Sequence, residues 1–181
     1  MSESRLVFKH CAEALLRGLG PRLTPTLKTR LEQQGLGGAN ELPPAFEYER
    51  WQQILSAAAA ELSPADPKAG HFTLGELITD AYLENFIGMA LKPVIKLIGM
   101  RRALGRMKQN FRVANNYSEV EVSDVGPGHV HLRVNETGDM AAFYRGILAR
   151  GLELTLAPKG LEVDIVEEAA DAVVYSVRWA A

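Results

Sequence analysis

The spacing of apolar residues first changes at Asn115-Asn116, and this change constrains the fold more than any other feature. Before it, apolar residues recur every three or four positions, the period of an amphipathic helix. After it, apolar and polar residues alternate, the period of a strand with one buried face. The 181-residue chain is therefore predicted to be α+β, with a helical half over residues 1–115 and a sheet-plus-helix half over residues 116–181. We expect the two halves to form one domain.

The helical half carries recognisable helix starts. Apolar spacing predicts a first helix over residues 4–19, ended by glycines. Thr24-Pro25 predicts a second start, a hydroxyl cap followed by a proline at a position that needs no N–H. The segment YERWQQILSAAAAEL, residues 48–62, predicts a third helix. A capping box from Thr73 to Glu76 predicts the start of a fourth.

The most apolar segment, NFIGMALKPVIKLIGM, covers residues 85–100. Lys92, Pro93 and Lys96 interrupt it, so it is predicted to be core and not a membrane span, which needs roughly 20 apolar residues. Pro93 should break or bend the helix. A last helix follows with a narrow apolar stripe, and Asn115-Asn116 should end it, because asparagine tolerates the left-handed conformation.

The C-terminal half is predicted to be a β-β-α-β-β unit that forms a four-stranded antiparallel sheet with helices on one face. In the first hairpin, pairing Val122 with Val130 sets Glu119 opposite Arg133 and Glu121 opposite His131. In the second hairpin, one strand face is aromatic and apolar. That face is predicted to be core, with the wall of a cavity between sheet and helices as the alternative; it comprises Val173, Tyr175, Val177 and Trp179.

Positive charge is concentrated in the middle of a chain whose net charge is −2. Residues 85–118 contain no Asp or Glu, but they hold seven cations: Lys92, Lys96, Arg101, Arg102, Arg106, Lys108 and Arg112. Such a surface attracts anions, and guanidinium groups suit phosphate or carboxylate. We therefore expect a ligand site made of Arg102, Arg106, Arg112, Asn115, Asn116 and Tyr117. The alternative is a solvated helix face with salt bridges to acidic strand residues, namely Glu119, Glu121, Glu162 and Asp164.

Other chemistry has weaker support in the sequence. No nucleophile elbow, phosphate loop or dinucleotide motif is present, so no enzyme is expected. His129 and His131 could supply two metal ligands, with Glu119 or Glu121 as a third, but cross-strand pairing explains them without a metal. The single cysteine, Cys11, is predicted to be an unreactive residue of the core.

Composition also bears on partners and location. Aromatic residues among the cations are sparse and the rest of the chain is not basic, which does not favour nucleic-acid binding. The N-terminus lacks the pattern of a secretory signal, and no transmembrane segment is expected. The expected location is the cytoplasm.

Several segments resemble a domain-of-unknown-function family that is largely restricted to myxobacteria. They are NFRVANNYSEVEV, LLRGLGPRLTPTLKTRLEQQGL, FYRGILARGLELTL and VVYSVRW, together with Trp51. The resemblance covers nearly the whole chain and implies a fold but no activity.

The predicted architecture is also similar to the ligand-binding fold of haem nitric-oxide sensors, vinyl-reductase-like domains and Bet3-type tethering subunits. This similarity implies a sensory or scaffolding module with a cavity between helices and sheet. The haem sensors hold the propionates with a Tyr-x-Ser-x-Arg motif. Here Tyr175-Ser176-Val177-Arg178 departs from it and no helix histidine takes the proximal position, so we expect no haem and no other cofactor.

Together these features predict a non-enzymatic cytoplasmic module that binds a small anionic or amphipathic ligand or acts in signalling. The competing hypothesis is a protein-interaction or dimerisation module without a ligand, using an exposed apolar patch from FIGMALKPVIKLIGM. A homodimer or a partner protein is expected in that case.

Overall fold

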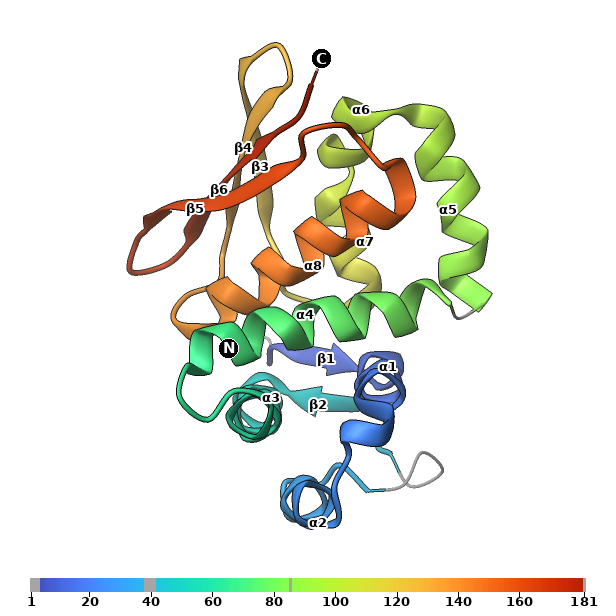
Figure 1. Ribbon diagram of the computed structural model, residues 1–181, viewed down its shortest axis with the longest axis vertical. Helices are drawn as coiled ribbons and strands as arrows, with labels where there is room; N and C mark the ends of the chain where they lie inside the picture. Colours follow the sequence, from blue (N-terminus) through green and yellow to red (C-terminus); the bar gives the residue numbers. More distant parts are fainter. Residues whose placement is uncertain (1–3, 38–41, 85, 181) are drawn as a thin grey trace.

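One long helix, α4 (Pro67–Leu83), crosses the middle of the molecule, between the elements of residues 6–62 and those of residues 86–178 (Figure 1). The structure is a computed structural model, and it describes residues 4–37, 42–84 and 86–180, with the side chains at 86, 87 and 91 excepted. The other elements are β1 (Leu6–Phe8), α1 (Lys9–Leu19), the 3-10 helix η1 (Gly20–Arg22), α2 (Pro25–Gln33), β2 (Ala45–Glu47), α3 (Tyr48–Leu62), α5 (Phe86–Ile98), α6 (Met100–Gly105), α7 (Met107–Ala114), β3 (Val120–Gly126), β4 (His129–Val134), α8 (Asp139–Leu156), β5 (Glu162–Glu168) and β6 (Val173–Arg178).

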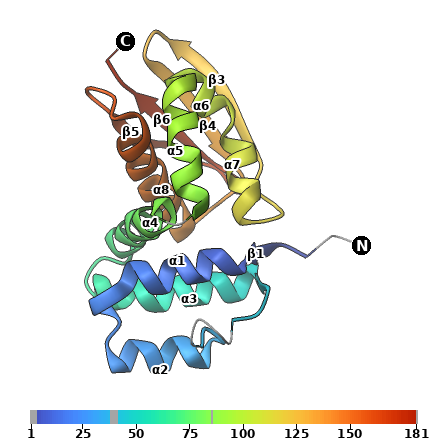
Figure 2. The ribbon, with the colours of Figure 1, turned by 90° about the vertical axis from the view of Figure 1, so that its right-hand side faces the viewer.

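The fold is α+β, as the change of period predicts. Helices α1, α2 and α3 form one end of the molecule, and α8 lies between α4 and a four-stranded antiparallel sheet of order β3-β4-β6-β5 (Figures 1 and 2). The inner face of β6 is core, because Val173, Tyr175 and Val177 are all 0% exposed. The Tyr175 hydroxyl donates to the carbonyl of Ala141 on α8 at 2.9 Å, which satisfies its polar end. Trp179 is only partly buried.

Glycines let α4 approach its neighbours closely. A Cβ atom at Gly75 would lie 2.2 Å from the carbonyl oxygen of Phe143 on α8, and one at Gly146 would lie 2.2 Å from that of Phe72 on α4. A Cβ at Gly70 would lie 2.3 Å from a carbonyl oxygen of α3. The absence of side chains at these positions therefore sets the distance between the helices.

The N-terminal prediction is wrong at one point: residues 6–8 form a strand, and the helix begins only at Lys9. This strand pairs antiparallel with β2, and Val7 also bridges to Asn115. Three extended residues are too short to show a period of two, so their pairing partners decide their conformation. The Thr24 cap and the helix over residues 48–62 are confirmed, and the Thr24 hydroxyl accepts from Leu27 N at 3.1 Å.

The capping box predicted at Thr73 is wrong, because this residue lies inside α4. The helix begins at Pro67, and the Asp66 carboxylate accepts from Ala69 N at 3.0 Å. Asp66-Pro67 is the same cap-then-proline signal that marks the start of α2 at Thr24-Pro25.

The last helix of this half is broken into α6 and α7 at Arg106. Asn115 ends α7 as predicted, but its backbone is extended, with φ −156° and ψ 169°, not left-handed. Pro93 lies within α5 and does not end it. The prediction that this apolar segment is core is wrong for part of its surface, because Met89, Val94 and Leu97 are exposed.

The predicted register of the first hairpin is wrong. Val122 pairs with Leu132, and Glu121 pairs with Arg133. Strand β3 runs on to Gly126 with an irregularity after Asp124, so the turn consists only of Pro127 and Gly128. A hairpin register follows from the turn length and the bulge, which alternation alone does not specify.

Candidate ligand cavity

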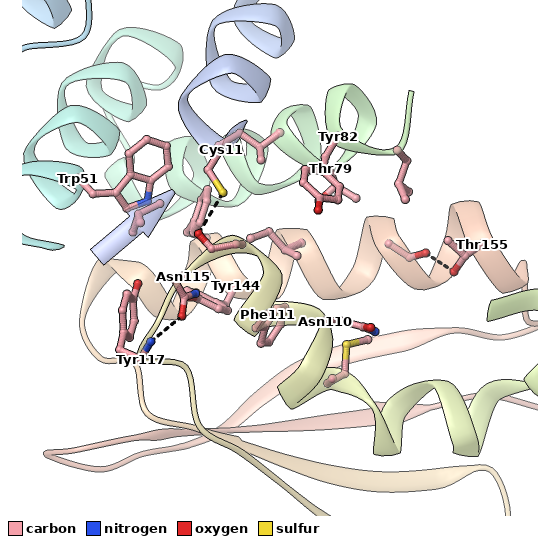
Figure 3. Close-up of a pocket in the computed structure, with 18 of the residues that line it drawn as sticks. Cys11, Trp51, Thr79, Tyr82, Asn110, Phe111, Asn115, Tyr117, Tyr144 and Thr155 are labelled. Carbon is pink, nitrogen blue, oxygen red and sulfur yellow. Dashed lines mark hydrogen bonds between the residues drawn. The ribbon is translucent and has the colours of Figure 1, made fainter. Parts of the chain in front are cut away.

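A cavity of about 180 Å³ lies where α1, α4, α7 and α8 meet, with Ile95 of α5 at its side (Figure 3). Aliphatic and aromatic side chains make up most of its wall. Among the described residues, none that lines it is Asp, Glu, Lys, Arg or His. It lies on the α4 side of α8, whereas the sequence alternative placed a cavity against the aromatic face of β6.

Large apolar side chains of α7 and two small residues shape the wall of the cavity. Met107 and Phe111, from the apolar stripe predicted for the last helix, face the cavity from α7. The small residues Ala114 and Gly151 leave space opposite α4, where the nearest side-chain atom to a Cβ at Gly151 would be Thr79 Cγ2, at 3.8 Å. The cavity is thus bounded by large side chains and widened by small ones.

Several polar groups in the wall are already satisfied. The Thr79 hydroxyl donates to the Gly75 carbonyl at 2.7 Å, and the Thr155 hydroxyl to the Gly151 carbonyl at 2.6 Å. The Cys11 thiol donates to the Ala114 carbonyl at 3.5 Å (Figure 3). Because these three protons are donated to backbone oxygens, they are not available to a ligand, and the wall of the cavity is largely apolar.

Other polar side chains of the wall remain available, among them Asn110 and Tyr82. The Asn110 carboxamide and the Tyr82 hydroxyl make no hydrogen bond with any residue that the structure describes. Burial raises the pKa of Tyr82 to about 12, so this phenol stays a neutral donor and acceptor. Both lie outside the set predicted from sequence. No local motif marks them, although Asn110 follows the apolar stripe residue Met107 by one helical turn.

Two of the predicted ligand residues, Asn115 and Tyr117, line the cavity. The Asn115 side-chain oxygen accepts from Tyr117 N at 3.1 Å and from Ser118 N at 2.8 Å, so its polar atoms hold the turn after α7. The Tyr117 ring packs edge-on against Tyr48 at 5.0 Å, and the guanidinium carbon of Arg5 lies 4.1 Å from its centre.

A buried carboxylate lies behind these rings. Glu136 is 1% exposed, accepts from the Tyr48 hydroxyl, and lies 3.4 Å from Nη2 of Arg5. Burial raises the pKa of Glu136, and the Tyr48 hydrogen bond and the charge of Arg5 oppose this rise. Arg5 and the Tyr48 hydroxyl therefore both stabilise the ionised form of this buried carboxyl group.

Two other predicted residues tie the chain together. Arg112 donates from Nε to the Ser118 carbonyl at 2.9 Å and also contacts the Asn116 carbonyl and Glu119. The Asn116 side chain accepts from Leu6 N at 2.8 Å and donates to the Ser4 carbonyl at 2.9 Å. Both thus link α7 and the following turn to other segments.

Part of the positive cluster is paired, but of the acidic residues that the alternative hypothesis names, only Glu119 pairs with a cation of the described cluster; Glu162 and Asp164 pair with Arg178 instead. Lys108 joins Arg112 on Glu119, and these two hydrogen bonds lower the pKa of that carboxylate. Arg101 pairs with Asp124. Arg102 and Arg106 are exposed, line no part of the cavity, and make no ion pair with any described residue. The six predicted residues therefore do not form a single site.

The wall of the cavity does not fit haem. Haem iron takes an imidazole, a thiolate, a thioether or a phenolate, and no histidine lines the described wall. Burial raises the pKa of the Cys11 thiol to about 12, which disfavours a thiolate. No cation in the described wall faces a place for propionates. Burial also raises the pKa of the three wall tyrosines, Tyr82, Tyr117 and Tyr144, which disfavours a phenolate, and Met107 supplies only a thioether.

The described residues form neither a metal site nor a membrane-spanning helix. No group of three His, Cys, Asp or Glu side chains in the described part of the chain has the geometry to hold a metal ion. His129 bonds to Ser176 Oγ at 2.8 Å and packs edge-on against His131. Within the described ranges, every helix is too short or too polar to cross a bilayer.

Comparison with solved structures shows that the fold is that of H-NOX domains. A doubly substituted Tt H-NOX has a TM-score of 0.73 at 10% identity, with 96% of this chain and 95% of that chain covered. The Fe(II) unliganded H-NOX protein from K. algicida has a TM-score of 0.70 at 10% identity, over 96% and 97%. An oxygen-binding H-NOX domain related to soluble guanylate cyclases has a TM-score of 0.66 at 11% identity, over 95% and 92%.

Comparison by sequence indicates the family. Among curated proteins, none matches this chain. The family model described as protein of unknown function (DUF2378) matches residues 5–180. The resemblance inferred from NFRVANNYSEVEV and the other segments is therefore confirmed at the level of a family without assigned function, and the chain belongs to DUF2378.

Proposed function

We propose that this protein is a sensory module that binds a small amphipathic ligand in the cavity and does not transform it. The observation that carries the proposal is an apolar cavity of about 180 Å³ whose wall presents polar side chains that make no hydrogen bond with a described residue, among them Asn110 and Tyr82. An apolar cavity of about 150 Å³ stays dry and binds small molecules such as benzene. The H-NOX fold supports the proposal, because one of the similar domains is described as oxygen-binding.

The wall favours a ligand with an uncharged polar end. A carboxylate or phosphate in this cavity would be desolvated without a facing cation, which is costly. A hydroxyl, carbonyl or amide needs only hydrogen bonds, and Asn110 and Tyr82 can supply both a donor and an acceptor. Of the two ligand classes expected from sequence, the cavity therefore favours the amphipathic class.

Thermal unfolding with a matched pair of probes tests this proposal. At about 100 times its Kd a ligand adds about 2.7 kcal/mol to the unfolding free energy, which raises Tm by roughly 5–10 °C for a chain of this size. We expect 1-hexanol to raise Tm at concentrations where hexanoate at neutral pH does not. No shift with either probe, or an equal shift with both, contradicts the proposed ligand class.

Two variants locate the binding. Ile147→Trp fills the cavity and should abolish the hexanol shift, whereas Val166→Trp adds the same ring at an exposed strand position and should keep it. Asn110→Leu removes one hydrogen bond and should weaken hexanol binding about tenfold. Retention of the shift in Ile147→Trp would place the ligand elsewhere.

A further inference from the structure

The outer face of α5 is apolar and exposed. Leu97 is 88% exposed, Met89 58% and Val94 47%, and Pro93 is exposed between them. Figure 2 shows α5 on the outside of the molecule, in front of α8. A helix of this length presents about 20 Å of such surface. Protruding apolar side chains of this size in one patch mark an interaction site.

Uncompensated positive charge borders this face. Lys92 and Lys96, four residues apart, lie along one edge of α5. Arg102 and Arg106 follow in α6 and are exposed. None of these four makes an ion pair with a residue that the structure describes, and the chain from residue 85 to residue 118 has no Asp or Glu.

The combination fits an anionic lipid surface. An interfacial helix buries apolar side chains at the boundary of headgroups and acyl chains while lysines on its edge reach lipid phosphates. A second copy of the chain is a poorer occupant, because a two-fold contact through α5 would bring Lys92 and Lys96 against their own copies. An apolar face with cations along its border fits a partner that is both apolar and negatively charged.

We propose that α5 docks this protein on anionic membranes, with Met89, Val94 and Leu97 inserted at the interface and Lys92 and Lys96 on the phosphates. This inference goes beyond the proposed ligand binding and stands without it. It also gives a role to the cations that no carboxylate of the described chain neutralises.

Flotation of the full chain with vesicles provides the test. We expect binding to vesicles of phosphatidylcholine with about one third phosphatidylglycerol, and little binding to phosphatidylcholine alone. Raising salt from about 0.1 M to about 1 M, which shortens the Debye length from about 10 Å to about 3 Å, should weaken it strongly. Failure of the wild-type protein to float with the anionic vesicles overturns the proposal.

Surface variants assign the binding to α5. Lys92→Gln with Lys96→Gln should weaken binding about 25-fold, at about fivefold for each cation. Lys28→Gln with Lys159→Gln removes two exposed lysines elsewhere and should leave binding within about twofold. Equal losses in the two double variants would mean that total charge, and not this face, drives the association.

A second pair of variants tests the contribution of the apolar side chains to vesicle binding. Leu97→Ser should weaken vesicle binding about tenfold or more. Val166→Ser changes an exposed apolar residue on β5 and should not. If light scattering shows a dimer that Leu97→Ser dissociates, the face is an interface between copies and the lipid proposal fails. Ile147→Trp, which fills the cavity, should float with the vesicles like wild type. Failure of the ligand proposal would therefore appear in the thermal unfolding experiment, and failure of the membrane proposal in the flotation experiment.

Discussion

At the residue scale, the buried Glu136 gives the protein a definite pH response. Burial raises its pKa above the ordinary value of 4.5, so the folded state binds the proton more tightly than the unfolded state. Its contribution to stability is therefore greatest below pH 4.5 and is lost as pH rises through the raised folded value. Across that window we expect the unfolding free energy of wild type, relative to Glu136→Gln, to fall by about 1.4 kcal/mol for each pH unit.

Urea unfolding of both proteins over a pH series measures this difference, and terms such as the oppositely shifted Glu119 cancel because both proteins contain them. Glu49→Gln, at an exposed position early in α3, is the control for the loss of one carboxylate. A difference that stays constant with pH, or grows as pH rises, contradicts the prediction.

At the element scale, the crossing of α4 and α8 depends on glycine. A methyl group at Gly146 would lie 2.2 Å from the Phe72 carbonyl oxygen, which is backbone and cannot rotate away. We expect Gly146→Ala to lower the unfolding free energy by about 1–3 kcal/mol through overpacking. Gly151→Ala, on the same helix, adds a methyl group 3.8 Å from Thr79 Cγ2, an ordinary contact. It should be neutral or stabilising by up to about 1 kcal/mol. Chemical denaturation of both variants measures their unfolding free energies. Equal changes in the two variants would contradict the prediction that the close approach of α4 and α8 requires glycine at residue 146.

At the scale of the whole molecule, α4 packs on α1 and α3 as well as on α8, which couples the helical half to the sheet half. We expect one cooperative unfolding transition. Trp51 is buried in the helical half, and Trp179 follows β6 in the sheet half. In Trp51→Phe and in Trp179→Phe, the remaining indole fluorescence should change at the same denaturant concentration as the far-ultraviolet circular dichroism. Separate midpoints in either variant would show that the halves unfold independently.

The sequence predicted correctly those elements that depend on residues close together in the chain. The cap at Thr24, the helix over residues 48–62 and the alternation in β4 and β6 were all predictable, because each depends on residues within one turn or one strand. The hairpin register and the start of α4 were not predicted. A bulge after Asp124 sets the first, and Asp66 rather than Thr73 caps the second.

The candidate site was predictable only in part. Asn115 and Tyr117 were singled out from sequence, and both line the cavity. Arg112 was singled out for its charge, but its donors are taken by the turn after α7 and by Glu119. Asn110 and Tyr82 were missed, because what distinguishes them is a missing hydrogen-bond partner in a shared space.

By itself the sequence determined the fold class, since the period of the apolar pattern decides whether a segment buries a helix face or a strand face. It also determined that positive charge gathers between residues 85 and 118. Only the tertiary structure decided which of those charges are neutralised and that α5 turns an apolar face outward. It alone created the cavity, because the wall is drawn from positions between Val7 and Thr155, and such distant residues meet only through helix packing.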